Sequence, residues 1–192
     1  IMANSTAEEL GRTTYTQPAI FVHSMMLWKI LNSTTGMVPV SAAGHSLGEY
    51  SALCAAEVIS FEDALRCIKV RAQAMDSAQP QGLFGMMAVV GPPAERVSQI
   101  LQSLPDDDLV SIANFNCLEQ TVLSGTVSGL KTAMDAFSGE KRCRCVMLPV
   151  SSAFHTERMA SAQRELSLFL DHIEFKSPVF PVISNVTGLE FP

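Results

Sequence analysis

The chain has 192 residues, of which 47% are hydrophobic and 17% are charged. This composition is sufficient for one folded domain and excludes a disordered chain, a collagen-like fibre and a coiled coil. The formal net charge of -6 argues against general nucleic-acid binding, which needs a basic surface. No apolar run reaches the ~18 residues of a membrane-spanning helix, so we expect no membrane span.

The beginning of the chain is predicted to be helical. Ser5 and Thr6, followed by two glutamates, predict a first helix. Thr16-Gln17-Pro18 predicts the start of a second helix, with Pro18 in its first turn. Apolar side chains surround most of the axis of this second helix, so we expect it to be buried and His23 to be a core residue.

A strand and two further helices are predicted next. Residues 37–43 form a short apolar run that predicts a buried strand. A helix is expected directly after it, over about 47–57. Ser60 and Asp63 form a capping-box pattern, which predicts a longer helix that ends near Ser77.

The segment 83–148 has an internal order of its own. The expected elements are a strand over 86–90, a helix opened by Pro92 and Pro93, strands over 109–113 and 121–124, a helix capped by Ser128, and a strand over 144–148. This β-α-β-β-α-β order is that of a split ferredoxin-like unit, which begins and ends on a strand and can be inserted into another domain. Beyond it we expect a helix over about 157–170, a strand over 179–184 and a turn over 185–188.

The pattern Gly44-x-Ser46-x-Gly48 lies between a predicted strand and a predicted helix. This is the context of a nucleophile elbow, in which a strained turn pushes a serine hydroxyl out of the sheet. The backbone N–H of Leu47 would then point at a developing oxyanion. An ordinary tight turn is the alternative interpretation.

A serine nucleophile needs a general base, and His155 is the best candidate among four histidines. It lies among small and apolar residues just before a helix, where a packing role is the alternative. His45 adjoins the serine, but neighbouring side chains on such a turn diverge. His172 is expected to be solvated at a helix end.

Arg71 lies at the margin of the apolar stripe on the helix predicted after Ser60. A half-buried arginine should have an anionic partner. Two interpretations stay open: an internal ion pair with Glu49 or Asp76, or a guanidinium that holds a substrate carboxylate through two parallel hydrogen bonds.

Two clusters suggest metal sites only weakly. The acidic run 106–108 is expected to be a solvated turn, and Cys143 and Cys145 have no histidine nearby, so we expect no metal. The odd number of five cysteines indicates reduced thiols in an intracellular compartment.

A basic cluster stands out in this acidic chain. It consists of Lys141, Arg142 and Arg144. The cluster is either a solvated hairpin end or a docking patch for an acidic partner.

Together these motifs resemble those of the malonyl-CoA:acyl-carrier-protein transacylases and the related acyltransferase domains of fatty-acid and polyketide synthases. The resemblance runs along nearly the whole chain. Its most specific parts are Gly44-His45-Ser46-Leu47-Gly48-Glu49, the position of Arg71, and Ala153-Phe154-His155. Further matching segments are Thr16-Gln17-Pro18-Ala19, Asn114-x-Asn116-x-x-x-Gln120 and Ser184-Asn185-Val186-Thr187-Gly188.

The resemblance implies an α/β fold in which an α/β-hydrolase-like core carries an inserted ferredoxin-like (βαββαβ) subdomain. The catalytic core would comprise residues 1–82 and 149–192, and the subdomain residues 83–148. The family carries a glutamine-containing motif that nothing before Thr16 matches, and it continues past the last predicted turn. We therefore expect a core that is incomplete at both ends.

The resemblance also implies an activity. A malonyl group would pass from malonyl-CoA to the phosphopantetheine thiol of acyl carrier protein, in ping-pong order through an ester on Ser46, and would supply fatty-acid synthesis. His155 would be the general base, Leu47 would contribute to the oxyanion hole, and Arg71 would bind the malonyl carboxylate. No metal or redox cofactor is implied, because a thioester is already activated.

Further roles follow from the same resemblance. Phe154 would occupy the space that an α-methyl group needs, and His45 and Asn116 would contribute to substrate binding. The partners would be malonyl-CoA and acyl carrier protein, with the protein either monomeric or part of a larger synthase. The Ala-Phe-His form favours a mitochondrial or other organellar matrix over the cytoplasm.

Two other functions stay open. A serine hydrolase or thioesterase could use the same elbow, although such enzymes usually carry an acid between serine and histidine in the chain, and none stands out here. A non-catalytic acyltransferase fragment could bind acyl-CoA or a carrier protein without turnover.

Overall fold

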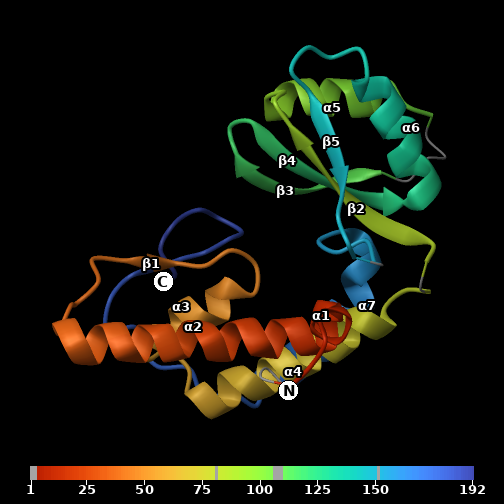
Figure 1. The fold of residues 1–192 in the computed structure, drawn as a ribbon. Coiled ribbons are helices and arrows are strands. Elements are labelled where there is room, and N and C mark those ends of the chain that lie inside the picture. The colour runs from red at the N-terminus through yellow and green to blue at the C-terminus, as the bar shows by residue number, and fades with distance from the viewer. Residues whose placement is uncertain (1–3, 81, 106–109, 151) are drawn as a thin grey trace. The chain divides into compact units, whose positions relative to one another are not determined.

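The computed structural model describes residues 4–80, 82–105, 110–150 and 152–192. The chain divides into two compact units, one formed by Ile1–Gln73 and Arg164–Pro192 and the other by Ala74–Gln163. Figure 1 labels most of the helices and strands of both units. The acidic run 106–108, which we expected to be a solvated turn, lies outside the described residues.

Helices dominate the first unit. The helices are α1 (Ala7–Gly11), α2 (Thr13–Thr35), α3 (Gly48–Ala55), α4 (Phe61–Ser77) and α7 (Ala160–Leu170), and a short 3₁₀ turn (Glu157–Met159) precedes α7. Both predicted N-terminal caps are confirmed. Thr6 and Glu9 form the capping box of α1, and the Ser60 hydroxyl oxygen accepts the Asp63 N–H at 3.0 Å before α4. Helices α4 and α7 each continue from one unit into the other.

Helix α2 differs from its prediction in two respects. It begins at Thr13, so Pro18 lies inside the helix and not in its first turn. Arg12 caps both the end of α1 and the start of α2, so the second helix starts earlier than the Pro18 signal indicates. The helix is also not buried all round, because the rest of the unit covers only one side of it. The exposed residues include Ile20, His23, Met26, Leu27, Ile30 and Leu31.

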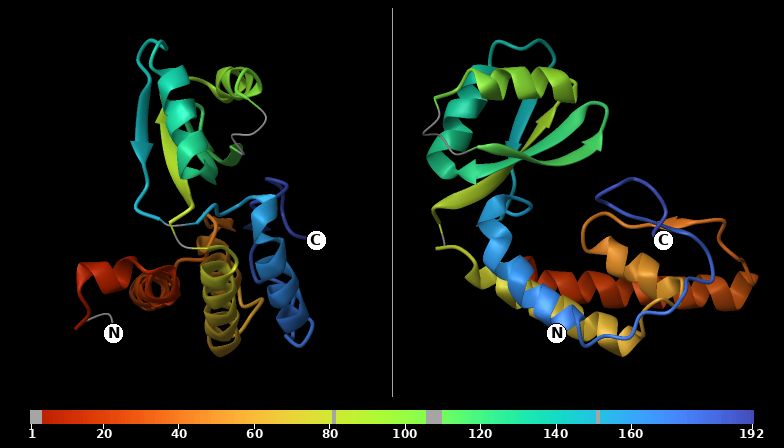
Figure 2. Two further views of the ribbon diagram at one scale, coloured as in Figure 1. Left: turned by 90° about the vertical axis from the view of Figure 1, so that its right-hand side faces the viewer. Right: turned by 180° about the vertical axis from the view of Figure 1, so that it is seen from behind.

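The core of the first unit forms around the covered side of α2. Phe21 is fully buried and packs in a cluster with Leu47, Ile59, Cys67 and Ile68. Side chains of α7 also pack against this cluster, and Figure 2 shows α7 alongside α4. The apolar stripe of α4 is therefore covered from both α2 and α7.

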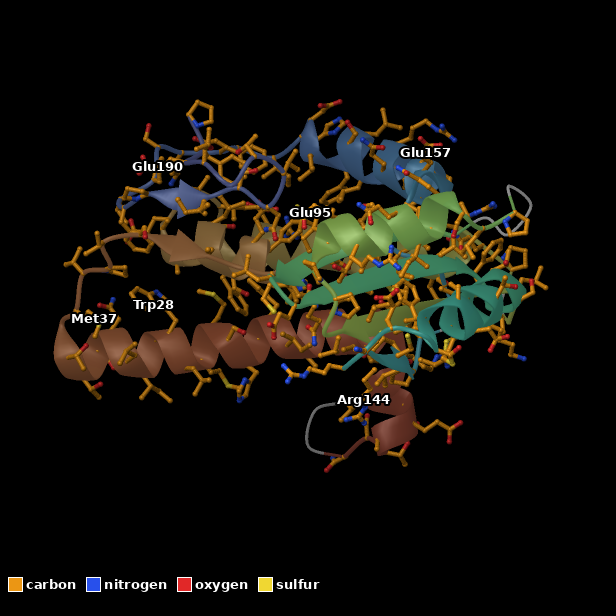
Figure 3. The ribbon with its side chains drawn as sticks, turned by 90° about the horizontal axis from the view of Figure 1, so that it is seen from above. Trp28, Met37, Glu95, Arg144, Glu157 and Glu190 are labelled. Carbon is orange, nitrogen blue, oxygen red and sulfur yellow. The ribbon has the colours of Figure 1, made fainter. Side chains whose placement is uncertain are left out.

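A second cluster supports the strands of the first unit. Trp28 meets Phe180 edge to face, with ring centroids 6.2 Å apart, and packs with Val182 and Ala42. Figure 3 shows Trp28 on the side of α2 that faces β1.

Two short parallel strands, β1 (Ala42–Ala43) and β6 (Val182–Ile183), pair with each other. Both are shorter than the predicted strands over 37–43 and 179–184, because inter-strand pairing covers only two residues of each. Val38 and Val40, expected to be buried, are 77% and 92% exposed. The pairing places the carboxyl ends of the two strands next to each other, so the turns that follow them are neighbours.

The turn after β1 requires glycine at one position. A β-carbon on Gly44 would overlap the backbone of Gly48, whereas a β-carbon on Gly48 would meet open space. The backbone segments at Gly44 and Gly48 approach each other closely at this turn. Residue 44 must therefore be glycine for steric reasons, whereas residue 48 need not be.

The second unit contains a four-stranded antiparallel sheet with the predicted order of elements. These are β2 (Phe84–Val90), α5 (Ala94–Gln102), β3 (Ser111–Cys117), β4 (Gln120–Thr126), α6 (Val127–Phe137) and β5 (Arg144–Met147), and the spatial strand order is β3-β4-β2-β5. One cap was predicted wrongly. The hydroxyl of Thr126, not of Ser128, accepts the Gly129 N–H at 3.0 Å, so α6 begins two residues earlier than a Ser128 cap would place it.

Helices α5 and α6 cover one face of this sheet (Figure 1). Side chains alternate between the two faces, as the strand period requires. Met87, Val89 and Leu123 face the helices, while Met86 and Val122 face the other way. The alternation explains why the sequence pattern located these strands.

The five cysteines are all free thiols. Burial raises the pKa of Cys54 to about 11 and that of Cys145 to about 12, and it also raises the pKa of Cys67 and Cys143. Cys117 is exposed at the end of β3. The thiols of this chain therefore differ in reactivity.

We expect Gly44→Ala to lower the free energy of unfolding by about 3 kcal/mol, because the added methyl group must displace backbone. Gly48→Ala is the matched control and should leave stability unchanged or slightly increased, since it adds a methyl group in open space at a helix start. Urea unfolding followed by circular dichroism measures both. Equal stability of the two variants would contradict the close approach at Gly44.

We expect iodoacetamide at pH 8 to alkylate Cys117 at least ~10-fold faster than Cys54 or Cys145, because alkylation needs the thiolate and a raised pKa depletes it. Raising the pH toward 10 should speed the reaction of Cys54. Peptide mass spectrometry over time measures each site, and Cys117→Ser should remove the fast phase. Equal rates at pH 8 would contradict the burial of these thiols.

Candidate active site

Ser46 lies at the sharp turn between β1 and α3, with a left-handed φ of 51°. Three consecutive hydrogen bonds tighten the turn: Gly48 N–H to the His45 carbonyl, Glu49 N–H to the Ser46 carbonyl and Tyr50 N–H to the Leu47 carbonyl. A positive φ is costly for a residue with a side chain, and such strain clusters at active sites. The conformation agrees with the strained turn that the Gly-x-Ser-x-Gly pattern predicts.

The two backbone N–H groups at the elbow differ in their partners. The Ser46 N–H donates to Oδ1 of Asn185 at 3.2 Å. The Leu47 N–H has no hydrogen-bond acceptor within the described part of the chain. Leu47 is the N-cap residue of α3, and its side chain is buried in the core. Its N–H is therefore held at a fixed position and is available to a ligand oxygen.

Arg71 extends from α4 to the nucleophile candidate. Its Nη2 donates to the Ser46 Oγ at 3.0 Å, and its Nη1 donates to Oε1 of Gln17. Burial lowers the pKa of Arg71, while nearby Tyr50 and Glu49 raise it. Neither of the two ion pairs among the described residues involves Arg71, so the first of its two open interpretations, an ion pair with Glu49 or Asp76, is not formed.

Gln17 was missed by the sequence analysis as a site residue. It is one of two buried residues of α2, and its Nε2 donates to the Thr13 hydroxyl at 2.8 Å. This bond aims the amide oxygen at Arg71. The neutral amide supports the guanidinium without neutralising it, so the positive charge remains available to an anion.

Asn185 was also missed, although the turn that contains it was predicted. Its Nδ2 donates to the Gly44 carbonyl at 2.6 Å, and its backbone N–H donates to Oε1 of Glu49 at 2.9 Å. Local sequence carries no sign of these contacts, because Asn185 lies 139 residues after Ser46.

His155 and Phe154 belong to the second unit. His155 is exposed and left-handed, with φ 59°. The segment before it is anchored, because the buried Ala153 donates its N–H to Oε1 of Gln79 at 2.9 Å. Phe154 packs on the sheet face formed by Met86, Ala88 and Val122.

The remaining candidates are surface residues. Asn116 lies on β3 and donates from Nδ2 to Oε1 of Gln120 at 2.9 Å. His45 is exposed beside Ser46. The basic cluster, which consists of Lys141, Arg142 and Arg144, is exposed around the start of β5.

The described residues contain neither a cluster suited to a metal ion nor a helix suited to a membrane. No group of three or more His, Cys, Asp or Glu side chains in these ranges is arranged to hold a metal ion. No helix in them has both the length and the apolar character needed to cross a membrane.

Comparisons with known proteins point to one family. The model of the family described as "Acyl transferase domain" matches residues 1–190. The malonyl CoA-acyl carrier protein transacylase of Salmonella typhimurium is 38% identical over 180 residues, which are 94% of this chain and 58% of that protein. The protein of the same name from Bacillus subtilis is 39% identical over 183 residues, or 95% of this chain and 57% of that protein.

Solved structures agree with the sequence matches. A malonyl CoA-acyl carrier protein transacylase from Burkholderia pseudomallei superposes with a TM-score of 0.91 at 33% identity, covering 98% of this chain and 63% of that one. A malonyl-transacylase solved in complex with its type II polyketide-synthase acyl carrier protein also gives 0.91, at 36% identity and with coverage of 98% and 61%. The chain thus spans less than two thirds of the length of these relatives.

The elbow at Ser46, the mixed α/β fold and the match over residues 1–190 lead to the same conclusion. The chain belongs to the acyl transferase domain family.

Proposed function

We propose that this chain carries the nucleophile and the carboxylate-binding residue of a malonyltransferase, which moves a malonyl group from malonyl-CoA to the phosphopantetheine thiol of acyl carrier protein. The observation that carries the proposal is the hydrogen bond from the Arg71 guanidinium to the Ser46 hydroxyl oxygen. A cation directly at a nucleophile suits an acyl group that itself bears a carboxylate. The names of the relatives support the same substrate.

In the first half-reaction, the Ser46 Oγ forms a bond to the thioester carbonyl carbon. His155 accepts the serine proton, and the Leu47 N–H stabilises the oxyanion. The carbon–sulfur bond then breaks, and His155 returns the proton to the sulfur of CoA. The product is a malonyl ester on Ser46.

In the second half-reaction, the carrier-protein thiol attacks this ester. The thiol proton passes to His155, a new thioester bond forms, and the ester bond to Ser46 breaks with return of the proton to Oγ. No cofactor is required in this scheme, because the thioester of malonyl-CoA is already activated.

Arg71 and Phe154 set the acyl selectivity in this proposal. The guanidinium of Arg71 would form two parallel hydrogen bonds with the free malonyl carboxylate. Phe154, packed on Met86 and Ala88, would occupy the space of an α-methyl group and disfavour methylmalonyl. His45 and Asn116 are proposed as further substrate contacts.

Acyl carrier protein is the proposed partner. The solved complex of a related malonyl-transacylase with its carrier protein supports this choice. The exposed basic cluster of Lys141, Arg142 and Arg144 would be a docking surface for an acidic carrier protein. The protein would act alone as a monomer or within a larger synthase.

We also propose that the fold is an α/β-hydrolase-like core, residues 1–82 and 149–192, with an inserted ferredoxin-like subdomain, residues 83–148. The β-α-β-β-α-β order and the strand order β3-β4-β2-β5 support the subdomain. The parallel pair of β1 and β6 beside the elbow supports the core. The five free thiols support a reducing compartment, for which an organellar matrix is our proposal.

A serine hydrolase or thioesterase remains the second candidate, because the elbow geometry is shared. The charge of Arg71 disfavours it, since a neutral ester gives the half-buried cation no anionic partner. Incubation with malonyl-CoA separates the candidates. A lasting malonyl adduct supports transfer, continuous release of malonate supports hydrolysis, and the absence of both supports a non-catalytic fragment.

We expect Ser46→Ala to abolish covalent loading from malonyl-CoA, because no other oxygen replaces the lost nucleophile. Intact-mass spectrometry detects the adduct, and peptide mapping locates it. Ser51→Ala is the matched control on α3. Its hydroxyl is buried without a hydrogen-bond partner in the described residues, so its loss should leave loading unchanged. An adduct that persists in Ser46→Ala would overturn the assignment of the nucleophile.

We expect Arg71→Ala to slow malonyl loading about 100-fold, the loss of about 3 kcal/mol of charge-assisted hydrogen bonding. Acetyl loading from acetyl-CoA should change less than ~10-fold, since acetyl has no carboxylate. Arg66→Ala, an exposed arginine on the same helix, is the control and should change neither rate. Equal losses for both acyl groups would show that Arg71 does not select the carboxylate.

A further inference from the structure

The turn after β6 contacts the nucleophile elbow on both sides of His45. The Asn185 side chain accepts the Ser46 N–H at Oδ1 and donates from Nδ2 to the Gly44 carbonyl, with distances of 3.2 and 2.6 Å. Its backbone N–H donates to Oε1 of Glu49 at 2.9 Å. One residue thus binds the elbow before the serine, at the serine and in the first turn of α3.

Asn185 is held in place by its own turn. The Gly188 N–H donates to the Ser184 carbonyl at 2.9 Å, and the Val186 N–H donates to the Ser184 Oγ at 3.1 Å. The Ser184 N–H in turn donates to the Leu189 carbonyl at 2.9 Å. Asn185 is nevertheless exposed, so apolar packing does not explain its contacts.

We propose that Asn185 is a positioning residue, which together with Glu49 holds the Ser46 backbone in its left-handed conformation. This inference rests on the proposed role of Ser46 as nucleophile. A planar amide has one acceptor and one donor group side by side, and both match the elbow here. The Glu49 carboxylate fixes the backbone of Asn185 and thereby the place of the amide.

The contact also decides which N–H group can serve an oxyanion. Asn185 occupies the Ser46 N–H, which leaves the Leu47 N–H for the ligand. Loss of the amide would release the Ser46 N–H and let the strained turn relax. The hydroxyl would then leave the geometry in which it attacks, and small displacements of a nucleophile slow a reaction strongly.

The test measures the rate and the final extent of Ser46 modification in Asn185→Ala, with two reagents. A fluorophosphonate probe reports an activated serine regardless of the natural substrate, and malonyl-CoA reports the proposed reaction. We expect probe labelling to be at least ~10-fold slower than in the unchanged chain, yet to reach one label per chain. Thr187→Ala is the control, because among the described residues its hydroxyl accepts only the Leu189 N–H of the same turn.

A merely structural role gives a different result. A partly unfolded Asn185→Ala would label at the normal rate but to a lower extent, and this outcome would overturn the proposal, as would a normal rate at full extent. A chain that accepts the probe but not malonyl-CoA would refute the proposed substrate and leave the positioning role standing. A chain unlabelled by either reagent would overturn both.

Variants of Glu49 test the same role without altering the amide. Glu49→Gln retains an acceptor for the Asn185 N–H, so labelling should stay within about 2-fold of the unchanged chain, whereas Glu49→Ala should slow it about 10-fold. Equal rates in both variants would contradict a positioning role for this contact. If Asn185→Ala fails to fold, this pair decides the question.

Discussion

The left-handed backbone of Ser46 is the constraint on which the rest of the site depends. A serine reaches φ 51° only when its surroundings compensate the strain. The surroundings here are the close crossing at Gly44, the hydrogen bonds of the turn and the short parallel pairing of β1 with β6. That pairing covers two residues of each strand, yet it brings together turns that are far apart in the sequence. The elbow is therefore a tertiary feature as much as a local motif.

Local rules accounted for much of the fold. Ser60 capped the helix that carries Arg71, and alternating side chains located the sheet of the second unit, since one sheet face packs on helices. Helix α2 was misjudged because composition counts apolar residues without stating which face a neighbour covers. Ile30 is 60% exposed although its sequence surroundings are those of a core helix. The lengths of β1 and β6 were overestimated for a similar reason, because a strand extends only as far as its hydrogen-bonded partner and a local pattern does not show where that partner ends.

The site residues likewise fall into those that local sequence predicts and those that depend on distant contacts. The Gly-x-Ser-x-Gly spacing located Ser46, and the helical stripe located Arg71. Gln17 and Asn185 were not predicted as site residues, because their contacts join distant segments and because asparagine and glutamine are common on protein surfaces. Of the two interpretations left open for Arg71, the internal ion pair is not formed among the described residues. The guanidinium donates instead to two neutral oxygens, from Gln17 and Ser46, and keeps its positive charge.

The sheet of the second unit has one further consequence, which concerns how near its first and last strands bring the two ends of the segment. The Leu148 N–H donates to the Met86 carbonyl at 2.9 Å, so the chain leaves this sheet beside the point where it arrives. The place where the chain enters the sheet and the place where it leaves are separated by one strand spacing, ~4.8 Å. Closing a segment whose two ends lie this near each other costs little loop-closure entropy, which is the property that the proposed insertion of residues 83–148 would need.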